Sequence, residues 1–355
     1  MAQSAAFTAC PPERIIPVED RAAGLRGVIV LHSLRLGPAA GGCRFWHYDD
    51  DGALHADALR LAEGMAYKNA LADLPLGGGK SVLAVPDRPY DREKLFEAFG
   101  RAVRELEGDY ITAEDVGTTV ADMTAVRRAT RHVAGLTQEP GRPGGDPSPW
   151  TARGVFLSMR VAARRRFGCD LDGLTVAVQG LGNVGSRLCE LLHDAGAKLI
   201  VAEPRPGVAA HIACRYGAEV SASDTILSAR ADIFAPCALG GVLDADTVPL
   251  LRAGLVCGGA NNVLATAEDG DRLAGRGVLY APDYVVNAGG IIHVAGEYLG
   301  WEMADVARRV EQTGERLERV FAHADREGLP PARAADRLAR ERIARAPLPA
   351  ERRSA

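Results

Sequence analysis

The sequence predicts an α/β protein with two domains, because short apolar strands alternate with helical patterns and a glycine-rich turn stands between one such strand and helix. Its 355 residues, 47% of them hydrophobic, exceed the size at which one core usually stops growing. We therefore expect an N-terminal α/β domain over residues 1–140, a Rossmann-type dinucleotide-binding domain over 141–330 and a cleft between them. A C-terminal helix and tail, residues 331–355, should pack back on the first domain.

Elements of the first domain follow from β-branched runs and from apolar residues at helical spacing. The segment Gly37-Pro38-Ala39-Ala40-Gly41-Gly42 is typical of a turn. The pattern along the chain predicts a strand over 27–34, a helix over 55–74, a strand over 81–85, a helix over 95–106 and a strand that begins at residue 110.

The segment QEPGRPGGDPSP, residues 138–149, contains four prolines and three glycines and cannot hold a helix or central strand. It predicts a hinge between the domains. Beyond it, short apolar runs separated by helical patterns are typical of buried parallel strands. They span 174–179, 198–202, 232–235, 254–257 and 277–280, and residues 303–344 should be mostly amphipathic helix with a solvated Arg-rich end.

Composition argues against several classes of protein. The net charge is −4 and no block of like charge could attract nucleic acid or an anionic membrane. The N-terminus lacks the pattern of a secretory signal and no apolar run is long enough to span a membrane, so we expect a cytoplasmic location. Seven cysteines without CxxC spacing and eight histidines without HxH or HxxxH spacing predict neither disulfides nor a metal site.

The segment Gly180-Leu181-Gly182-Asn183-Val184-Gly185 lies between a predicted strand and a predicted helix, 186–195, as a dinucleotide-binding turn requires. The first glycine permits the tight turn, the second lets the backbone approach a pyrophosphate, and the third lets helix and strand pack closely. The helix N-terminus then offers unpaired N–H groups to the phosphates. A glycine turn that binds no nucleotide is the alternative.

Glu203 ends the next predicted strand, at the distance expected of the acid that binds the adenosine ribose. A carboxylate there repels a 2′-phosphate and favours NAD over NADP. Arg205, two residues on, could instead pair with a 2′-phosphate and leaves NADP open.

Two lysines of the first domain stand in contexts that suit catalysis. Lys68 lies inside a predicted helix, and Lys80 follows Gly77-Gly78-Gly79 at a connection where the backbone can approach a substrate closely. If both lysines lie in one cleft, one of them could hold a substrate carboxylate. Its positive charge, together with burial of the other lysine, would favour the neutral amine of that other lysine, which could then act as a base. Asp115 follows a strand and could move protons, although an Asp there is often only a turn former.

Eight motifs in order carry a family resemblance: GPAAGGCRFW, EGMAYKN, PLGGGKSV, ITAEDVGT, QGLGNVG, FAPCALGG, GGANN and YAPDYVVNAGG. Together they resemble the leucine, valine and phenylalanine dehydrogenases, within the glutamate dehydrogenase superfamily, from about residue 28 to 344. The resemblance implies oxidative deamination of an L-amino acid with NAD to a 2-oxo acid and ammonia, by a homo-oligomer assembled through the first domain.

The resemblance also implies roles for single residues. Lys68 binds the substrate α-carboxylate with Gly41, Gly42 and Asn262, Lys80 is the base that activates water, and Asp115 exchanges protons with the substrate nitrogen. The residues expected at the cofactor are Gly180, Gly182, Asn183, Val184, Gly185, Glu203, Arg205, Ala260 and Asn262.

Four apolar residues are expected to line the side-chain pocket: Ala40, Ala113, Ile291 and Val294. Family members that act on glutamate have a lysine and a hydroxyl residue where Ala40 and Val294 stand, so a glutamate side chain would be buried unpaired. Ala40 leaves room for a large side chain, which favours phenylalanine slightly, with leucine or valine as the alternative.

Trp150 and Arg153 depart from the family pattern. We expect Trp150 to pack between the domains, and substrate size stays open on its account. A 2-hydroxy-acid dehydrogenase and a non-catalytic nucleotide-binding protein remain as distant alternatives.

Overall fold

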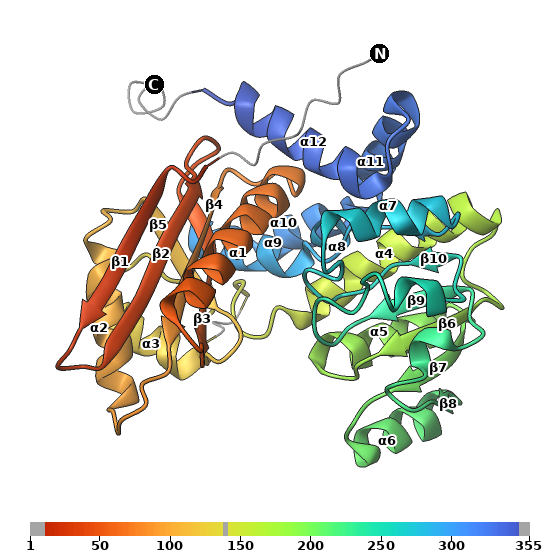
Figure 1. Cartoon of the computed structure of the whole chain (residues 1–355), viewed down its shortest axis with the longest axis horizontal. Helices are drawn as coiled ribbons and strands as arrows, with labels where there is room; N and C mark the ends of the chain where they lie inside the picture. Colours follow the sequence, from red (N-terminus) through yellow and green to blue (C-terminus); the bar gives the residue numbers. More distant parts are fainter. Residues whose placement is uncertain (1–10, 138–140, 348–355) are drawn as a thin grey trace. The chain divides into compact units, whose positions relative to one another are not determined.

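The computed structural model describes residues 11–137 and 141–347 as two compact units (Figure 1). Within these ranges the first unit comprises residues 11–66, 75–136 and 345–347, and the second comprises 67–74, 137 and 141–344. The expected division at residue 140 therefore misses the excursion of residues 67–74 into the second unit. No helix in the described part of the chain is long and apolar enough to cross a membrane.

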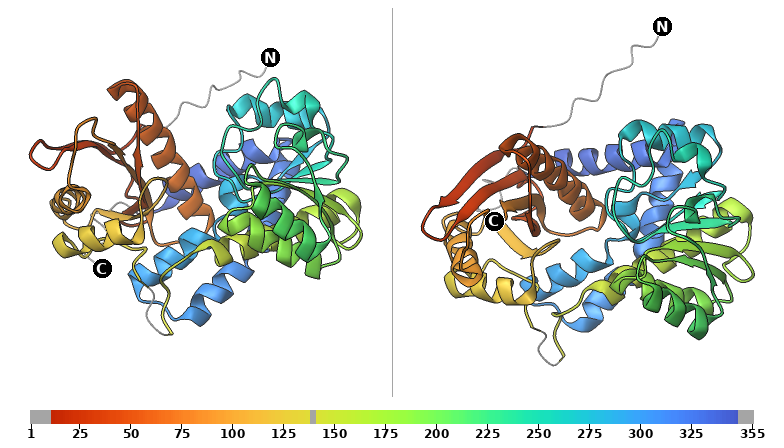
Figure 2. Two further views of the ribbon diagram at one scale, coloured as in Figure 1. Left: turned by 90° about the horizontal axis from the view of Figure 1, so that it is seen from below. Right: turned by 60° about the horizontal axis from the view of Figure 1, so that its bottom comes forward.

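The first unit is a five-stranded sheet with helices on both faces. Its strands and helices are β1 (Arg14–Asp20), β2 (Leu25–Ser33), β3 (Ala39–Trp46), α1 (Asp51–Leu71), β4 (Gly77–Ala84), α2 (Arg92–Arg104), β5 (Tyr110–Glu114) and α3 (Val120–Ala129). The strand order is β1-β2-β4-β3-β5, with β3 parallel to β4 and β5 and the other pairs antiparallel. Helix α1 covers one face, and α2 and α3 cover the other (Figures 1 and 2).

Two glycine-rich segments that the sequence predicts as a turn and a connection are strands in the structure. Strand β3 begins at Ala39, and Gly77 to Gly79 already form the start of β4. A Cβ atom on Gly41 would lie 1.8 Å from the Gly79 carbonyl oxygen. Glycine is therefore needed because two backbones approach closely, and Lys80 lies within β4 rather than at the predicted connection before it.

The second unit has the strand order of a classic dinucleotide-binding sheet. Its strands are β6 (Thr175–Gln179), β7 (Lys198–Ala202), β8 (Glu219–Val220), β9 (Ile233–Pro236), β10 (Leu255–Val256) and β11 (Leu279–Tyr280). They are all parallel in the order β11-β10-β9-β6-β7-β8, so the order reverses beside β6. The predicted Rossmann-type domain is confirmed, and β8 is a short strand that the periodicity did not show.

Helices cover both faces of this sheet with two apolar cores. They are α4 (Ser148–Phe167), α5 (Asn183–Asp194), α6 (Pro206–Tyr216), α7 (Ala267–Gly275), α8 (Asp283–Val286), α9 (Gly289–Leu299), α10 (Met303–Glu311), α11 (Thr313–Glu327) and α12 (Pro331–Arg345). The expected docking of the C-terminal helix on the first domain stays a prediction, whereas the packing of this helix within the second unit is described. Ala334 and Ala335 of α12 are fully buried in the core of the second unit, because small side chains let α12 pack closely there. The tail beyond residue 347 lies outside the described residues.

The glycines of the turn between β6 and α5 differ in how tightly the surrounding structure constrains them. Gly180 has φ +91°, a conformation that L side chains rarely adopt, and a Cβ atom on Gly185 would lie 2.0 Å from the Gly180 carbonyl oxygen. A Cβ atom on Gly182 would meet nothing within 4 Å. Gly185 is therefore required by packing, whereas Gly182 leaves open space above the turn.

We expect Gly185→Ala to lower the free energy of unfolding by about 2 kcal/mol, because the added methyl group overlaps a backbone atom that cannot move away. Gly182→Ala is the control and should change stability by less than about 0.5 kcal/mol. Urea unfolding followed by circular dichroism measures both values. Equal stabilities of the two variants would contradict this packing.

Candidate functional site

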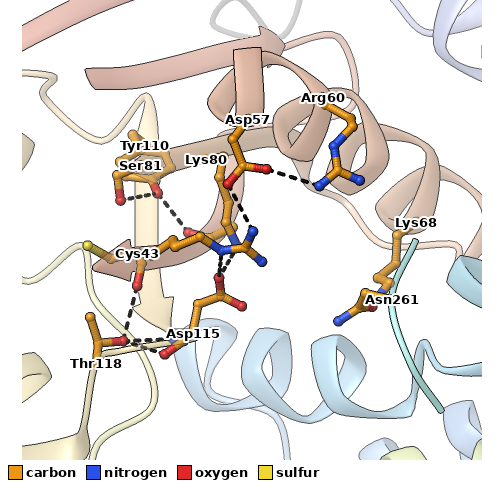
Figure 3. A network of polar contacts seen from close by, with 12 residues as sticks. Cys43, Asp57, Arg60, Lys68, Lys80, Ser81, Tyr110, Asp115, Thr118 and Asn261 are labelled. Carbon is orange, nitrogen blue, oxygen red and sulfur yellow. Dashed lines mark hydrogen bonds and ion pairs between the residues drawn. The ribbon is translucent and has the colours of Figure 1, made fainter. Parts of the chain in front are cut away.

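A buried ion pair joins two strands of the first unit. Lys80 on β4 has a side chain only 4% exposed, and its Nζ lies 2.8 Å from Oδ2 of Asp115, whose side chain is 19% exposed. Asp115 directly follows β5, as the sequence predicts. The structure thus brings together the proposed base and the proposed proton carrier (Figure 3).

The loop after β5 holds Asp115 by its backbone as well as by its side chain. The Asp115 N–H donates to Oγ1 of Thr118 at 2.8 Å, and the Thr118 hydroxyl lies 3.1 Å from the Cys43 carbonyl oxygen on β3 (Figure 3). The Thr118 N–H in turn donates to the Asp115 carbonyl at 3.0 Å. This closed turn holds the backbone of Asp115 against β3.

Sequence reasoning missed Arg44 and Asp57, which extend the ion pair into a network. Arg44 Nε lies 3.3 Å from the same Oδ2 of Asp115, and its Nη1 lies 2.9 Å from Oδ2 of Asp57 on α1. Asp57 also accepts hydrogen bonds from Tyr48 at 2.7 Å and Arg60 at 3.0 Å. The signal in the sequence was weak: Arg44 follows Gly42 by two residues and so shares its face of the strand.

The network keeps both carboxylates ionised. Burial alone would raise the pKa of Asp115, but the charges of Lys80 and Arg44 outweigh it and hold that pKa below its usual range. Burial opposes ionisation of Asp57 in the same way, and Tyr48 and Arg44 hold the pKa of Asp57 low. Arg44 therefore lies between two carboxylates that are charged at neutral pH.

Backbone groups of β3 lie beside this network. The Tyr110 hydroxyl on β5 donates to the Gly41 carbonyl at 2.7 Å and lies 3.1 Å from Oγ of Ser81 (Figure 3). A Cβ atom on Gly42 would lie 2.7 Å from Cβ of Asp115, so the carboxylate leaves no room for a side chain there. Ala40 and Ala113, expected in the substrate pocket, are buried on the adjacent strands β3 and β5.

Lys68 is positioned by contacts of the second unit, to which residues 67–74 belong. It lies in the last turn of α1, and its Nζ donates to Oδ1 of Asn261 at 2.9 Å (Figure 3). The same oxygen accepts a hydrogen bond from Asn287 at 2.8 Å. Sequence reasoning singled out Asn262, whose φ is +52° and whose carbonyl accepts from the Gly241 N–H at 2.7 Å. The adjacent Asn261, together with Asn287, was missed.

The turn after β6 is built to receive a dinucleotide. Asn183 and Val184 begin α5, whose N-terminus has no side-chain cap within the described structure. Its N–H groups and the open space above Gly182 suit a pyrophosphate. Ala260, also expected at the cofactor, is buried and donates its N–H to the Pro236 carbonyl at the end of β9.

Glu203 and Arg205 are bound to each other at the end of β7. One oxygen of Glu203 accepts from the Leu181 N–H at 2.9 Å, and the other lies 2.6 Å from Nε of Arg205. Arg205, foremost, and the Leu181 N–H lower the pKa of Glu203 to about 2. A charged carboxylate therefore lies at the glycine turn, with the guanidinium of Arg205 already engaged.

Helix α9 carries Ile291 and Val294 on one side, because residues three apart share a helix face. Both are partly exposed. The buried ring of His293, between them in sequence, stacks on Trp150 with ring centroids 6.0 Å apart.

The two departures from the family pattern, Trp150 and Arg153, thus have partners within the second unit. Arg153 makes a two-point contact with Glu311 at 2.8 and 3.1 Å. No group of three or more potential metal ligands occurs within residues 11–137 and 141–347.

Comparisons with known proteins cover nearly the whole chain. A family model for the Glu/Leu/Phe/Val dehydrogenase dimerisation domain matches residues 12–132. The model for glutamate/leucine/phenylalanine/valine dehydrogenase matches residues 146–211 and 207–349.

Curated relatives are similar along at least nine-tenths of their length. A leucine dehydrogenase of Geobacillus stearothermophilus is 47% identical over 332 residues, 93% of this chain and 90% of the relative. A valine dehydrogenase of Streptomyces coelicolor is 46% identical over 338 residues, 94% of this chain and 93% of the relative.

Among solved structures, L-tryptophan dehydrogenase from Nostoc punctiforme is similar with a TM-score of 0.82 and 37% identity, covering 95% of this chain and 97% of that one. The hetero-hexameric glutamate dehydrogenase from Thermus thermophilus, in its Leu-bound form, has a TM-score of 0.77 and 25% identity over 95% of this chain and 89% of that one. By its sequence motifs, its two units and these relatives, the chain belongs to the Glu/Leu/Phe/Val dehydrogenase family and is an amino-acid dehydrogenase.

Proposed function

We propose that this amino-acid dehydrogenase deaminates an apolar, branched-chain L-amino acid to its 2-oxo acid, with release of ammonia and formation of NADH, in a reversible reaction. The observation that carries the proposal is the buried pair of Lys80 and Asp115, 2.8 Å apart, beside the glycine backbone of β3. A lysine and a carboxylate in contact can move protons between water and a substrate nitrogen. The nucleotide-binding turn of the second unit accounts for the redox half of the reaction.

NAD is the cofactor, and when bound it accepts the hydride from the substrate Cα. Glu203 holds a negative charge where the phosphate of NADP would have to lie. Arg205, which could have paired with that phosphate, is bound to Glu203 instead. These contacts support NAD over NADP.

The proposed binding of the substrate uses its α-carboxylate. Lys68 supplies a positive charge, and the backbone of Gly41 and Gly42 and the residue Asn262 complete the contacts that the family resemblance implies. Support comes from Asn261, which fixes the Lys68 ammonium, and from Tyr110, which fixes the Gly41 carbonyl. Both groups are thus held in place by neighbouring side chains.

The proposed proton transfers follow removal of the hydride, which leaves an imino acid. Lys80, in its neutral form, takes a proton from a water molecule as the water oxygen forms its bond to the imino carbon, which gives a carbinolamine. Lys80 hands this proton to Asp115, which passes it to the carbinolamine nitrogen. The C–N bond then breaks and ammonia leaves with the bonding electrons, while Lys80 takes the hydroxyl proton as the C=O bond of the 2-oxo acid forms. The contact of Lys80 with Asp115 lets protons pass between them.

The substrate class rests on the four residues Ala40, Ala113, Ile291 and Val294, none of which could pair with a charged side chain. Our expectation of a slight preference for phenylalanine finds no support among the curated relatives, because the two described above are named leucine and valine dehydrogenases. We therefore place branched-chain amino acids first. The solved tryptophan dehydrogenase keeps larger substrates in the test.

We also propose a cytoplasmic homo-oligomer. The family model of the first unit is described as a dimerisation domain. Strand β1 is an edge strand of its sheet, and the exposed Ile15 lies on it, so this edge could pair with a second copy. The six cysteines within the described residues are free thiols, as suits a reducing compartment.

We expect Lys80→Ala to lower kcat roughly 10²- to 10⁴-fold, because the reaction loses its base. Binding of NADH, measured by fluorescence titration, should be unchanged. Lys94→Ala, at an exposed lysine of α2, is the matched control and should keep wild-type turnover. Wild-type kcat in Lys80→Ala would show that another group activates the water.

A substrate panel with NAD⁺ and NADP⁺ tests specificity. We expect kcat/KM to be highest for L-leucine, L-valine or L-isoleucine, and at least about a hundredfold lower for L-glutamate because its carboxylate would be buried unpaired. NADP⁺ should be the poorer cofactor. A larger kcat/KM for L-phenylalanine than for each branched-chain substrate would refute the branched-chain assignment, and oxidation of L-lactate alone would refute the reaction type.

We expect Arg44→Met to move the acid limb of the kcat/KM profile to higher pH, by about one unit. Burial raises the pKa of Asp115, and the charges of Lys80 and Arg44 lower it. Without Arg44 the pKa of Asp115 therefore rises, and its carboxylate becomes protonated at a pH at which the wild type is still active. Arg60→Met is the control, because Arg60 contacts Asp57 but not Asp115. An unmoved acid limb in Arg44→Met would show that Arg44 does not tune Asp115.

A further inference from the structure

The C-terminal end of α1, three to six residues beyond Lys68, breaks two local preferences. The Asp73 N–H donates to the Ala70 carbonyl and the Leu74 N–H to the Asn69 carbonyl, at 3.2 and 3.1 Å, which is the hydrogen-bond pattern of a Schellman cap. Asp73 holds the left-handed position of this cap with φ +59°, where glycine is usual. Its carboxylate also places a negative charge at the negative end of the helix dipole.

Three arginines of the second unit gather on this carboxylate. Arg316 Nε and Arg319 Nη2, both on α11, lie 3.1 and 2.9 Å from Oδ2 of Asp73. Arg342 on α12 contacts Oδ1. Although burial alone would raise the pKa of Asp73, Arg319, Arg342 and Arg316 hold that pKa below its usual range, so the carboxylate stays charged.

Arg316 makes this contact energetically important, because its guanidinium is buried. Its side chain is only 3% exposed, and within the described part of the chain Asp73 is the carboxylate that pairs with it. A buried guanidinium without its partner is strongly unfavourable. An aspartate at this cap is thus explained by the arginines that it binds and not by the helix that it ends.

The anchored turn is the one that carries Lys68. The Lys68 carbonyl accepts from the Ala72 N–H at 2.9 Å, one residue before Asp73. The Lys68 ammonium is bound by Asn261, and the neighbouring Tyr67 hydroxyl lies 2.6 Å from Nε of Arg340 on α12. Residues 67–74 are thus fastened to the rest of the second unit at the side chains of Tyr67 and Lys68 and at the carboxylate of Asp73.

We propose that Asp73 is a positioning residue: its carboxylate, held by Arg316, Arg319 and Arg342, sets the place of the Lys68 ammonium that binds the substrate carboxylate. This inference rests on the proposed function of Lys68. It predicts an effect confined to ligands with that carboxylate. The amino acid and the 2-oxo acid have it, whereas ammonium lacks it and NAD binds elsewhere.

The test compares Asp73→Asn, which removes the charge but tolerates the left-handed conformation, with Asp73→Gly, which removes both charge and strain. Steady-state kinetics in both directions should show KM for the amino acid and for the 2-oxo acid raised about tenfold, with KM for ammonium, KM for NAD⁺ and kcat within about twofold of wild type. Asp325→Asn is the control, because Asp325 lies on α11 and pairs with the exposed Arg165.

If the single variants fold poorly because Arg316 is left unpaired, Asp73→Gly combined with Arg316→Met removes both charges and should show the same split in KM values. Unchanged KM values for both carboxylate ligands would overturn the proposal, as would an equal rise for ammonium and NAD⁺, which would indicate a general loss of structure. Lys68→Ala separates this failure from that of the proposed function. If it raises KM for the carboxylate ligands and the Asp73 variants do not, only the role of Asp73 is wrong. If Lys68→Ala leaves those KM values unchanged, the role of Lys68 falls, and this inference with it.

Discussion

The ion pair between Lys80 and Asp115 is the interaction on which the arrangement of the first unit depends. A lysine in the middle of a buried strand is tolerated only with a partner, because an uncompensated buried charge is strongly unfavourable. The turn after β5 supplies the partner, and Thr118 holds that turn against β3. Arg44 and Asp57 then extend the pair into an alternating row of charges, so that each charge has an opposite neighbour.

This pair also explains why the neighbouring strand is made of small residues. Gly42 lies against the side chain of Asp115, and Gly41 lies against the backbone of β4 at Gly79. A side chain at either position would push the strands apart and separate the charges. The small residues of β3 therefore let the strands lie close enough together for the two charges to meet.

In the second unit, charged and polar groups are placed where anionic groups of the ligands are expected to bind. The turn after β6 has a negative charge from Glu203 on one side and the N–H groups of α5 on the other, which suits an unphosphorylated ribose next to a pyrophosphate. Lys68, although it lies on a helix that begins in the first unit, takes its contacts from the second. Its last helical turn is held by polar contacts where a glycine cap would have been the simpler solution.

Much of the fold was predictable because the signals are local. Strand and helix periodicity located most elements, and the glycine turn with its flanking strand and helix predicted the dinucleotide-binding unit. Periodicity failed at β3, where the glycines of GPAAGG are typical of a turn but serve close strand packing. It located the helix α12, but the small buried residues of that helix do not reveal in the sequence which core they enter. In both places the deciding neighbour is distant in the sequence.

The family can be identified from the sequence alone, because each motif is a continuous run of residues, and the same motifs single out Lys68, Lys80 and Asp115 as candidate site residues. The side chains that contact these residues become visible only in the folded chain: Arg44 lies 71 residues from Asp115 in sequence, and Asn261 lies 193 residues from Lys68. The contact of Asp73 with Arg316, 243 residues away, likewise becomes visible only there. Such pairs form when strands and helices pack. The sequence around a charged residue does not indicate which distant residue of opposite charge will pack against it.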